Sequence, residues 1–200
     1  MKLPFESYTS RWKTMFETLK EELSEKLSIL SPAIEHIGST SVEGLSAKPI
    51  IDIMIGVADN KDLDKVPPLL NNGSYVYYEK YNDDMPYRRF FVRLTNNAVD
   101  LGLPLVIQTK DEIPERMHDH TFRMAHIHVM PSSSEHWLRH LAFRDYLREH
   151  PAVLHEYQTL KERLVQKEWA DGNDYNAGKD VFLKKEEQNA ITWYKKLHHK

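Results

Sequence analysis

At 200 residues, the chain has the length at which a single domain is the usual organisation. It has no cysteine, which excludes disulfides, thiolate zinc sites and cysteine nucleophiles, and its formal charge of −3 disfavours nonspecific nucleic-acid binding, which needs a basic excess. No apolar run approaches the roughly 18 residues of a membrane span, and residues 1–6 lack the apolar stretch of a secretory signal, so we expect a cytoplasmic protein that is not inserted in a membrane.

The first predicted element is an amphipathic helix over residues 8–30. Apolar side chains recur there at steps of three or four residues, which is the spacing of one buried helix face, and charges occupy the other face. The apolar positions are Tyr8, Trp12, Phe16, Leu19, Leu23, Leu27 and Leu30.

The pattern then changes to that of a sheet. Runs of β-branched and aromatic residues, bounded by glycine, proline and asparagine, are typical of strands. The predicted strands are residues 34–37, 49–57, 75–81, 87–94 and 123–130, with residues 103–109 as a further candidate. The strands at 75–81 and 87–94 are separated by Asn82-Asp83-Asp84, a turn composition, so we expect them to pair as a hairpin. A short helix over residues 60–72 precedes them.

All of the chain after Ser132 is predicted to be helical. A serine-rich capping run begins a helix that extends to about residue 149, and Pro151 suits the first turn of a second helix, to about residue 169. A third helix is predicted over residues 175–197. We therefore expect one domain over residues 1–200, with an α/β core at 1–131 and C-terminal helices at 132–200.

The segment that says most about chemistry is residues 36–53, with the sequence HIGSTSVEGLSAKPIIDI. A strand that runs into Gly38 and the Ser39-Thr40-Ser41 turn can present backbone N–H groups and hydroxyls to a phosphate. Asp52 follows inside an otherwise apolar strand, where a carboxylate is costly unless a cation or hydrogen bonds compensate it. Taken alone, the segment is better explained as an ordinary tight turn with a capped helix. Together with Asp52, it predicts an anion-binding site.

Residues 36–53 resemble the signature of the GrpB-like proteins, which are related to a domain attached to some bacterial dephospho-CoA kinases. The resemblance covers most of the chain and continues at residues 140–151 (HLAFRDYLREHP), Tyr157, Lys161, Tyr175, Lys179, Phe182 and Trp193-Tyr194. It implies an α/β (α+β) fold, with a mixed sheet of the polymerase-β nucleotidyltransferase type, an N-terminal helix and a C-terminal helical segment. In that fold a Gly-Ser turn holds a triphosphate and carboxylates on the next strand hold divalent metal.

The resemblance also implies roles for individual residues. Asp52 and Ser39 are the predicted catalytic residues. The predicted phosphate-binding residues are Gly38, Ser39, Thr40, Ser41, Lys48, Arg144, Lys161 and Lys179. Arg144 suits a bidentate contact with phosphate and the lysines suit point-charge contacts. Without the resemblance, each of these cations on the helices is expected to be a solvated surface charge.

Met54 stands where the resemblance implies a second carboxylate, and a thioether is a poor ligand for Mg²⁺. His126 and His128 are candidate replacements, because their i,i+2 spacing on a strand sends both imidazoles to one face. The alternative is that both line a solvated sheet face. The predicted metal ligands are therefore Asp52, His126 and His128, for Mg²⁺, Mn²⁺ or Zn²⁺, and imidazoles favour a transition metal. The segment His118-Asp119-His120 is expected at the surface, outside the site.

Three functions remain open at this point. The first is transfer of a nucleotidyl group from a nucleoside triphosphate to a small acceptor. The second is non-catalytic binding of a nucleotide or a CoA-like metabolite by the same residues, which the missing carboxylate favours. The third is a hydrolase of the histidine-triad kind, which is disfavoured because Met130 and Pro131 follow the two histidines of residues 126–129. The expected partner is thus a small phosphorylated ligand, and the sequence indicates no oligomeric state.

Overall fold

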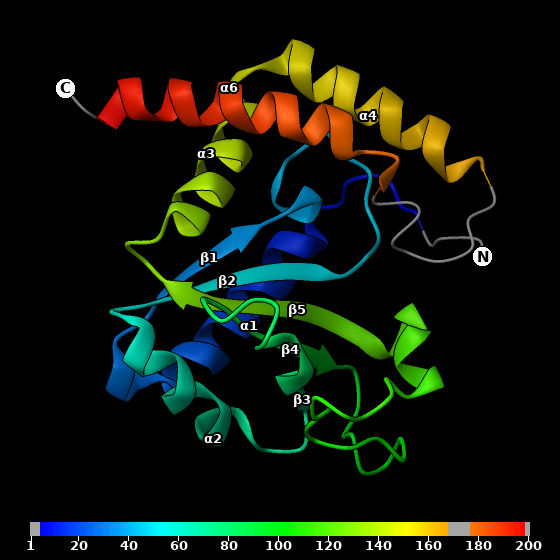
Figure 1. Cartoon of the computed structure of the whole chain (residues 1–200). Coiled ribbons are helices and arrows are strands. Elements are labelled where there is room, and N and C mark those ends of the chain that lie inside the picture. Colours follow the sequence, from blue (N-terminus) through cyan, green and yellow to red (C-terminus); the bar gives the residue numbers. More distant parts are fainter. Residues whose placement is uncertain (1–4, 168–176, 199–200) are drawn as a thin grey trace.

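The computed structural model describes residues 5–167 and 177–198. Strands from the first two thirds of the chain form one mixed sheet, with α1 on one side and the C-terminal helices gathered on the other (Figure 1). The expected mixed α/β architecture, with an N-terminal helix and a C-terminal helical segment, is confirmed.

The sheet has five strands in the order β1-β2-β5-β4-β3. Their bounds are Ala33–Ile37 (β1), Ile51–Val57 (β2), Tyr75–Tyr77 (β3), Arg89–Leu94 (β4) and Arg123–Pro131 (β5). Strands β2 and β5 are parallel, and the other neighbours are antiparallel, including the predicted hairpin of β3 and β4. The parallel pairing sets Asp52 opposite His126 and Met54 opposite His128.

Helix α1 (Arg11–Lys26) covers one face of the sheet, as its apolar spacing predicts. Its buried residues Trp12, Phe16, Leu19 and Leu23 pack in one cluster with the isoleucines at 51, 53 and 55 of β2. The short helix α2 (Val66–Leu70), which follows a 3₁₀ turn over Asn60–Lys65, adds to the same cluster. Alternation along β2 therefore sends Asp52 and Met54 to the opposite face.

The prediction of a strand at residues 103–109 is wrong. This segment makes one isolated bridge, in which Val106 lies beside Tyr77 and the neighbouring backbone groups hydrogen-bond to Tyr77. Its buried residues, Leu103 and Ile107, explain the apolar pattern that suggested a strand. Strand β3 is also shorter than predicted, because a 3₁₀ turn over Glu79–Tyr81 ends it.

The C-terminal helices are α3 (Glu135–Glu149), α4 (Pro151–Val165) and α6 (Asp180–His198). Ser134 caps α3 by accepting a hydrogen bond from the Trp137 backbone N–H at 3.1 Å, and Pro151 begins α4 as predicted. The predicted end of the second helix, near residue 169, and the predicted start of the third, at Tyr175, lie outside the described residues. Within the described ranges, no helix is long and apolar enough to cross a membrane.

Helix α3 is anchored on the second face of the sheet through Trp137. Its indole packs with Ile37, Met54 and Met130, and approaches Gly56 so closely that a Cβ there would lie 2.8 Å from the ring. The helix thus covers the C-terminal end of β2. The other end of the strand, which carries Asp52, faces a polar pocket.

Candidate functional site

Most of the predicted ligand-binding residues meet in one pocket of about 240 Å³ beside the N-terminal end of β2. We call it the lysine pocket, and its lining is Ser39, Thr40, Ala47, Lys48, Ile50, Asp52, His126, Lys161 and Lys179. The three lysines come from the loop before β2, from α4 and from the turn before α6. The fold therefore brings together three cations that are far apart in the sequence.

The turn after β1 forms one wall of the lysine pocket and rests directly on Asp52. Gly38 has a φ of +70°, and a Cβ at this position would lie 2.4 Å from Oδ2 of Asp52. The glycine thus makes room for the carboxylate, and Gly38 does not itself line the lysine pocket. Gly38 is among the predicted phosphate-binding residues, and that role stays a prediction.

Two further turn residues serve mainly to hold the turn. The Ser41 hydroxyl donates to the Gly38 carbonyl oxygen at 2.7 Å, and Ser41 does not line the lysine pocket. Thr40 does line it, but its Oγ1 lies 3.0 Å from Nε2 of the buried His36. Of the predicted phosphate-binding turn, Ser39 and Thr40 therefore reach the pocket.

Asp52 and His126 form a polar pair at the sheet side of the pocket. Nδ1 of His126 lies 3.3 Å from Oδ1 of Asp52, and its Nε2 lies 3.4 Å from Nη1 of Arg123. A proton on Nδ1 satisfies both contacts, because the imidazole then donates to the carboxylate and accepts from the guanidinium. Burial acts to raise the pKa of Asp52, but the hydrogen bond from His126 and the nearby histidines outweigh it and hold this pKa below its usual value. The carboxylate is thus ionised at neutral pH.

Lys161 is the most enclosed of the three cations, with 2% of its surface exposed. Its Nζ donates to the carbonyl oxygen of Ser46 and lies 5.1 Å from the centre of the Tyr157 ring. Burial, followed by the charge of Lys179, lowers the pKa of Lys161 to about 7. Burial and the charge of Lys48 lower the pKa of Lys179 to about 8. Like charges gathered away from water are costly, and a bound anion relieves that cost.

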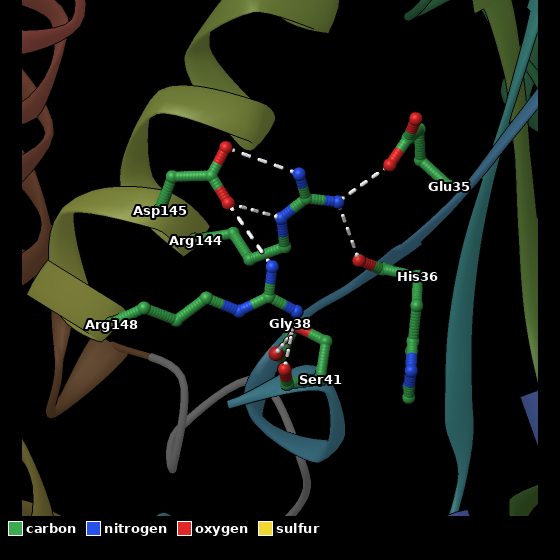
Figure 2. Close-up of polar contacts among 7 residues, drawn as sticks. All are labelled: Glu35, His36, Gly38, Ser41, Arg144, Asp145 and Arg148. Carbon is green, nitrogen blue, oxygen red and sulfur yellow. Dashed lines mark hydrogen bonds and ion pairs between the residues drawn. The ribbon is translucent and has the colours of Figure 1, made fainter. Parts of the chain in front are cut away.

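Arg144 is not among the residues that line the lysine pocket, and its role as a phosphate ligand stays a prediction. Its guanidinium lies between α3 and β1, where Nη1 donates to Glu35 Oε2 at 2.6 Å and to the His36 carbonyl oxygen at 3.1 Å (Figure 2). Its Nε and Nη2 donate to the two carboxylate oxygens of Asp145. This arginine therefore holds a helix to a strand.

The three predicted metal ligands are not gathered at one point. His128 lies two residues along β5 from His126, and its Nδ1 lies 3.3 Å from Nη1 of Arg88. Burial lowers the pKa of His128 to about 3. In the part of the chain that the structure describes, no three histidine, cysteine or acidic side chains are close enough to hold a metal ion. Met54 is fully buried, so the residues as positioned do not fit a two-metal site.

His120 contacts a residue of the lysine pocket without lining the pocket itself, and the sequence did not indicate this contact. We expected it at the surface, yet its Nε2 lies 3.5 Å from Nζ of Lys48 and burial lowers its pKa to about 4. A neutral imidazole can accept a hydrogen bond from the lysine and so orient it toward the pocket. The two residues are 72 positions apart, and no local pattern links them.

Comparisons with known proteins agree with the fold. The chain is 31% identical to the crystal structure of conserved protein GrpB from Enterococcus faecalis, with a TM-score of 0.72, and the match covers 95% of this chain and 98% of that one. It is 29% identical over 178 residues to the glutamate-rich protein GrpB of Alkalihalophilus pseudofirmus, covering 88% of this chain and 89% of the relative. It is also 31% identical over 188 residues to UPF0157 protein YqkA of Bacillus subtilis, covering 94% of this chain.

The chain spans about half the length of YqkA, 47%. The family model described as GrpB protein matches residues 3–189, which include every residue of the lysine pocket. The resemblance first noted in residues 36–53 therefore extends over nearly the whole sequence, and the chain belongs to the GrpB family.

Proposed function

We propose that this protein binds a phosphorylated small molecule in the lysine pocket. The observation that carries the proposal is the meeting of Lys48, Lys161 and Lys179 around one small cavity, beside the hydroxyl groups of the Ser39-Thr40 turn. Electrostatic attraction is stronger where water is partly excluded, so three partly or fully buried cations around one pocket favour an anion. Lysine ammonium groups and turn hydroxyls are common ligands of phosphate oxygens.

The charges of the pocket support a phosphate monoester in particular. When a bound anion keeps all three lysines protonated and Asp52 is ionised, the lining carries two positive charges in excess. A phosphate monoester carries between one and a half and about two negative charges at neutral pH, so it neutralises this excess without a metal ion. A triphosphate carries more negative charge, which a divalent cation would have to offset.

Nucleotidyl transfer is the second candidate function. It is favoured by the position of Asp52 against the turn that precedes the pocket, since transfer from a triphosphate needs an acidic group near the phosphates. Against it, Met54 is fully buried and supplies no second carboxylate. The described side chains also offer no group of three metal ligands. Binding without transfer is therefore the better supported of the two.

The proposal is tested by thermal unfolding with inorganic phosphate, the four common nucleoside triphosphates and coenzyme A, each with and without Mg²⁺, Mn²⁺ or Zn²⁺. A ligand at a hundred times its Kd stabilises the protein by about 2.7 kcal/mol. We expect stabilisation by at least one phosphorylated compound, and its loss in Lys48→Met. Lys110→Met, which changes an exposed lysine outside the pocket, is the matched control. Equal stabilisation of both variants would place the ligand elsewhere.

Pyrophosphate release, measured in the same panel, separates the two candidates. Binding without release for any triphosphate is expected. Release that depends on Asp52 would establish transfer and contradict a purely binding role.

A further inference from the structure

We propose that the ligand of the lysine pocket is a small phosphorylated compound that bears free hydroxyl groups, such as a sugar phosphate, and that one hydroxyl donates a hydrogen bond to Asp52. This inference rests on the proposed function and specifies the part of the ligand that is not phosphate. It follows from the presence of an ionised carboxylate in a pocket that is otherwise cationic.

Asp52 is a poor neighbour for a phosphate alone. Its side chain is 32% exposed, and it lines the pocket that holds the three lysines. Two negative groups in one pocket repel each other, so a ligand that fills this pocket favourably must present something other than an anion to the carboxylate. An ionised carboxylate accepts hydrogen bonds and donates none; His126 already donates to Oδ1 of Asp52, and the remaining lone pairs can accept from a further donor on the ligand.

A hydroxyl is the donor that the surrounding charges favour. An ammonium group on the ligand would approach Lys48, Lys161 and Lys179 and be repelled by them. A divalent cation would find no three suitable side chains close together in the described part of the chain. A hydroxyl is neutral, donates to the carboxylate, and can still accept a hydrogen bond from one of the lysines.

The size and composition of the pocket also favour a compact, polar ligand. Its volume of about 240 Å³ is below the range of roughly 300–1,000 Å³ that is typical of sites for drug-sized molecules. Among the described residues that line it, none is phenylalanine, tyrosine or tryptophan. Nucleobases stack on these side chains and on histidine, and His126 is the one such residue among the described lining, with both of its ring nitrogens in contact with Asp52 or Arg123. Ser39 and Thr40 also line the pocket, and their hydroxyls favour a ligand that forms hydrogen bonds.

The test is calorimetric titration of the full chain with ribose 5-phosphate, with butyl phosphate, which has no hydroxyl, and with ATP. A hydrogen bond to a charged group corresponds to about ten- to a hundredfold in affinity, so wild type is expected to bind ribose 5-phosphate tighter than butyl phosphate by that factor. Asp52→Asn, which keeps the side-chain shape, should weaken ribose 5-phosphate binding and strengthen butyl phosphate binding, because the repelling charge is gone. Lys161→Met should weaken both.

Each alternative outcome has its own signature. Equal affinity for the two monoesters, with an equal effect of Asp52→Asn on both, would overturn the hydroxyl assignment and leave phosphate binding intact. Tighter binding of ATP than of ribose 5-phosphate, by tenfold or more, would overturn the assignment in favour of a nucleotide. The failure of every phosphorylated compound to bind would overturn both this inference and the proposed function.

Discussion

At Gly38 the backbone approaches Asp52 so closely that no side chain fits between them. A Cβ there would meet Oδ2 of Asp52 at 2.4 Å, and the φ of +70° is itself unfavourable for other residues. The contact between Gly38 and the carboxylate of Asp52 also fixes where this carboxylate lies relative to Ser39 and Thr40. The shape of the lysine pocket therefore depends on this one glycine.

We predict that Gly38→Ala lowers the free energy of unfolding by about 1–3 kcal/mol more than Gly102→Ala does, and weakens phosphate binding. Gly102 is a matched control, because its φ is +66° and no atom lies within 4 Å of a Cβ placed there. The two glycines match in φ, but Gly38 also has a ψ of −172°, a combination that essentially only glycine adopts, so the difference reports this strain together with the contact with Asp52. Urea denaturation measures it, and equal losses for the two variants would show that the contact is unimportant.

Met54 occupies the position at which the resemblance implied a second carboxylate. Its side chain faces the same side of the sheet as Asp52, as the alternation of a strand requires, but it is fully buried with Ile37, Met130 and Trp137. Helix α3 thus covers residue 54, and a carboxylate at this position would be buried beneath Trp137.

We predict that Met54→Asp destabilises the protein by about 3 kcal/mol or more, because it buries a charge without a partner. Met54→Leu, which conserves volume, should cost less than about 1.5 kcal/mol. Chemical denaturation of both variants gives the comparison. A stable Met54→Asp protein with strengthened Mg²⁺ binding would contradict this account and revive the metal-dependent mechanism.

At the scale of elements, α3 is tied to β1 and to the turn at residues 39–41 by two arginines (Figure 2). Arg144 reaches Glu35 and the His36 carbonyl oxygen, and Arg148 donates to the Ser41 carbonyl oxygen at 2.7 Å. Asp145 accepts from both guanidinium groups. The helix therefore stabilises the turn at Ser41, and the neighbouring residues Ser39 and Thr40 line the lysine pocket.

We predict that Arg144→Met lowers the free energy of unfolding by about 2–4 kcal/mol, because its side chain is 12% exposed and its partners would lose their cation. Arg139→Met is the control on the same helix, since the Arg139 side chain is 37% exposed in its pair with Glu187, and its loss should cost about 1 kcal/mol or less. Thermal or urea denaturation distinguishes them. Similar losses would mean that the Arg144 contacts contribute no more than a surface pair.

Helices and strands that depend on the local spacing of apolar residues were predicted well. Contacts between side chains from distant segments were not predicted. The spacing of Trp12, Phe16, Leu19 and Leu23 predicts α1 because helix periodicity is local. The partners of Arg144 and His120 depend on segments 109 and 72 residues away. For that reason the sequence indicated neither the contacts of Arg144 with Glu35 and His36 nor the contact of His120 with Lys48.

At the scale of the whole molecule, the lysine pocket makes both stability and binding depend on pH. Burial lowers the pKa values of Lys161 and Lys179 to about 7 and about 8, whereas an unfolded lysine titrates near about 10.4. At a pH between these pKa values, the two lysines bind more protons in the unfolded chain than in the folded one. The contribution of these lysines to stability is therefore fully present above about pH 10.4 and is lost as the pH falls toward 7.

We predict that phosphate affinity changes in the opposite direction, falling as the pH rises from 7 to 9, because the ammonium groups that attract the anion become neutral. Ligand titrations at pH 7, 8 and 9 test this, with Lys161→Met expected to show a flatter profile than wild type. Affinity that is independent of pH in the wild type would show that neither lysine contacts the ligand.

The central claim is that the lysine pocket is the ligand site of this GrpB-family chain, and one measurement tests it most directly. Calorimetric titration with ribose 5-phosphate and with ATP compares wild type, Lys161→Met and Lys195→Met, the last of which changes an exposed lysine of α6. The account predicts that at least one ligand binds wild type and Lys195→Met with equal affinity, and binds Lys161→Met at least about tenfold more weakly. Equal affinity for Lys161→Met and wild type would contradict it.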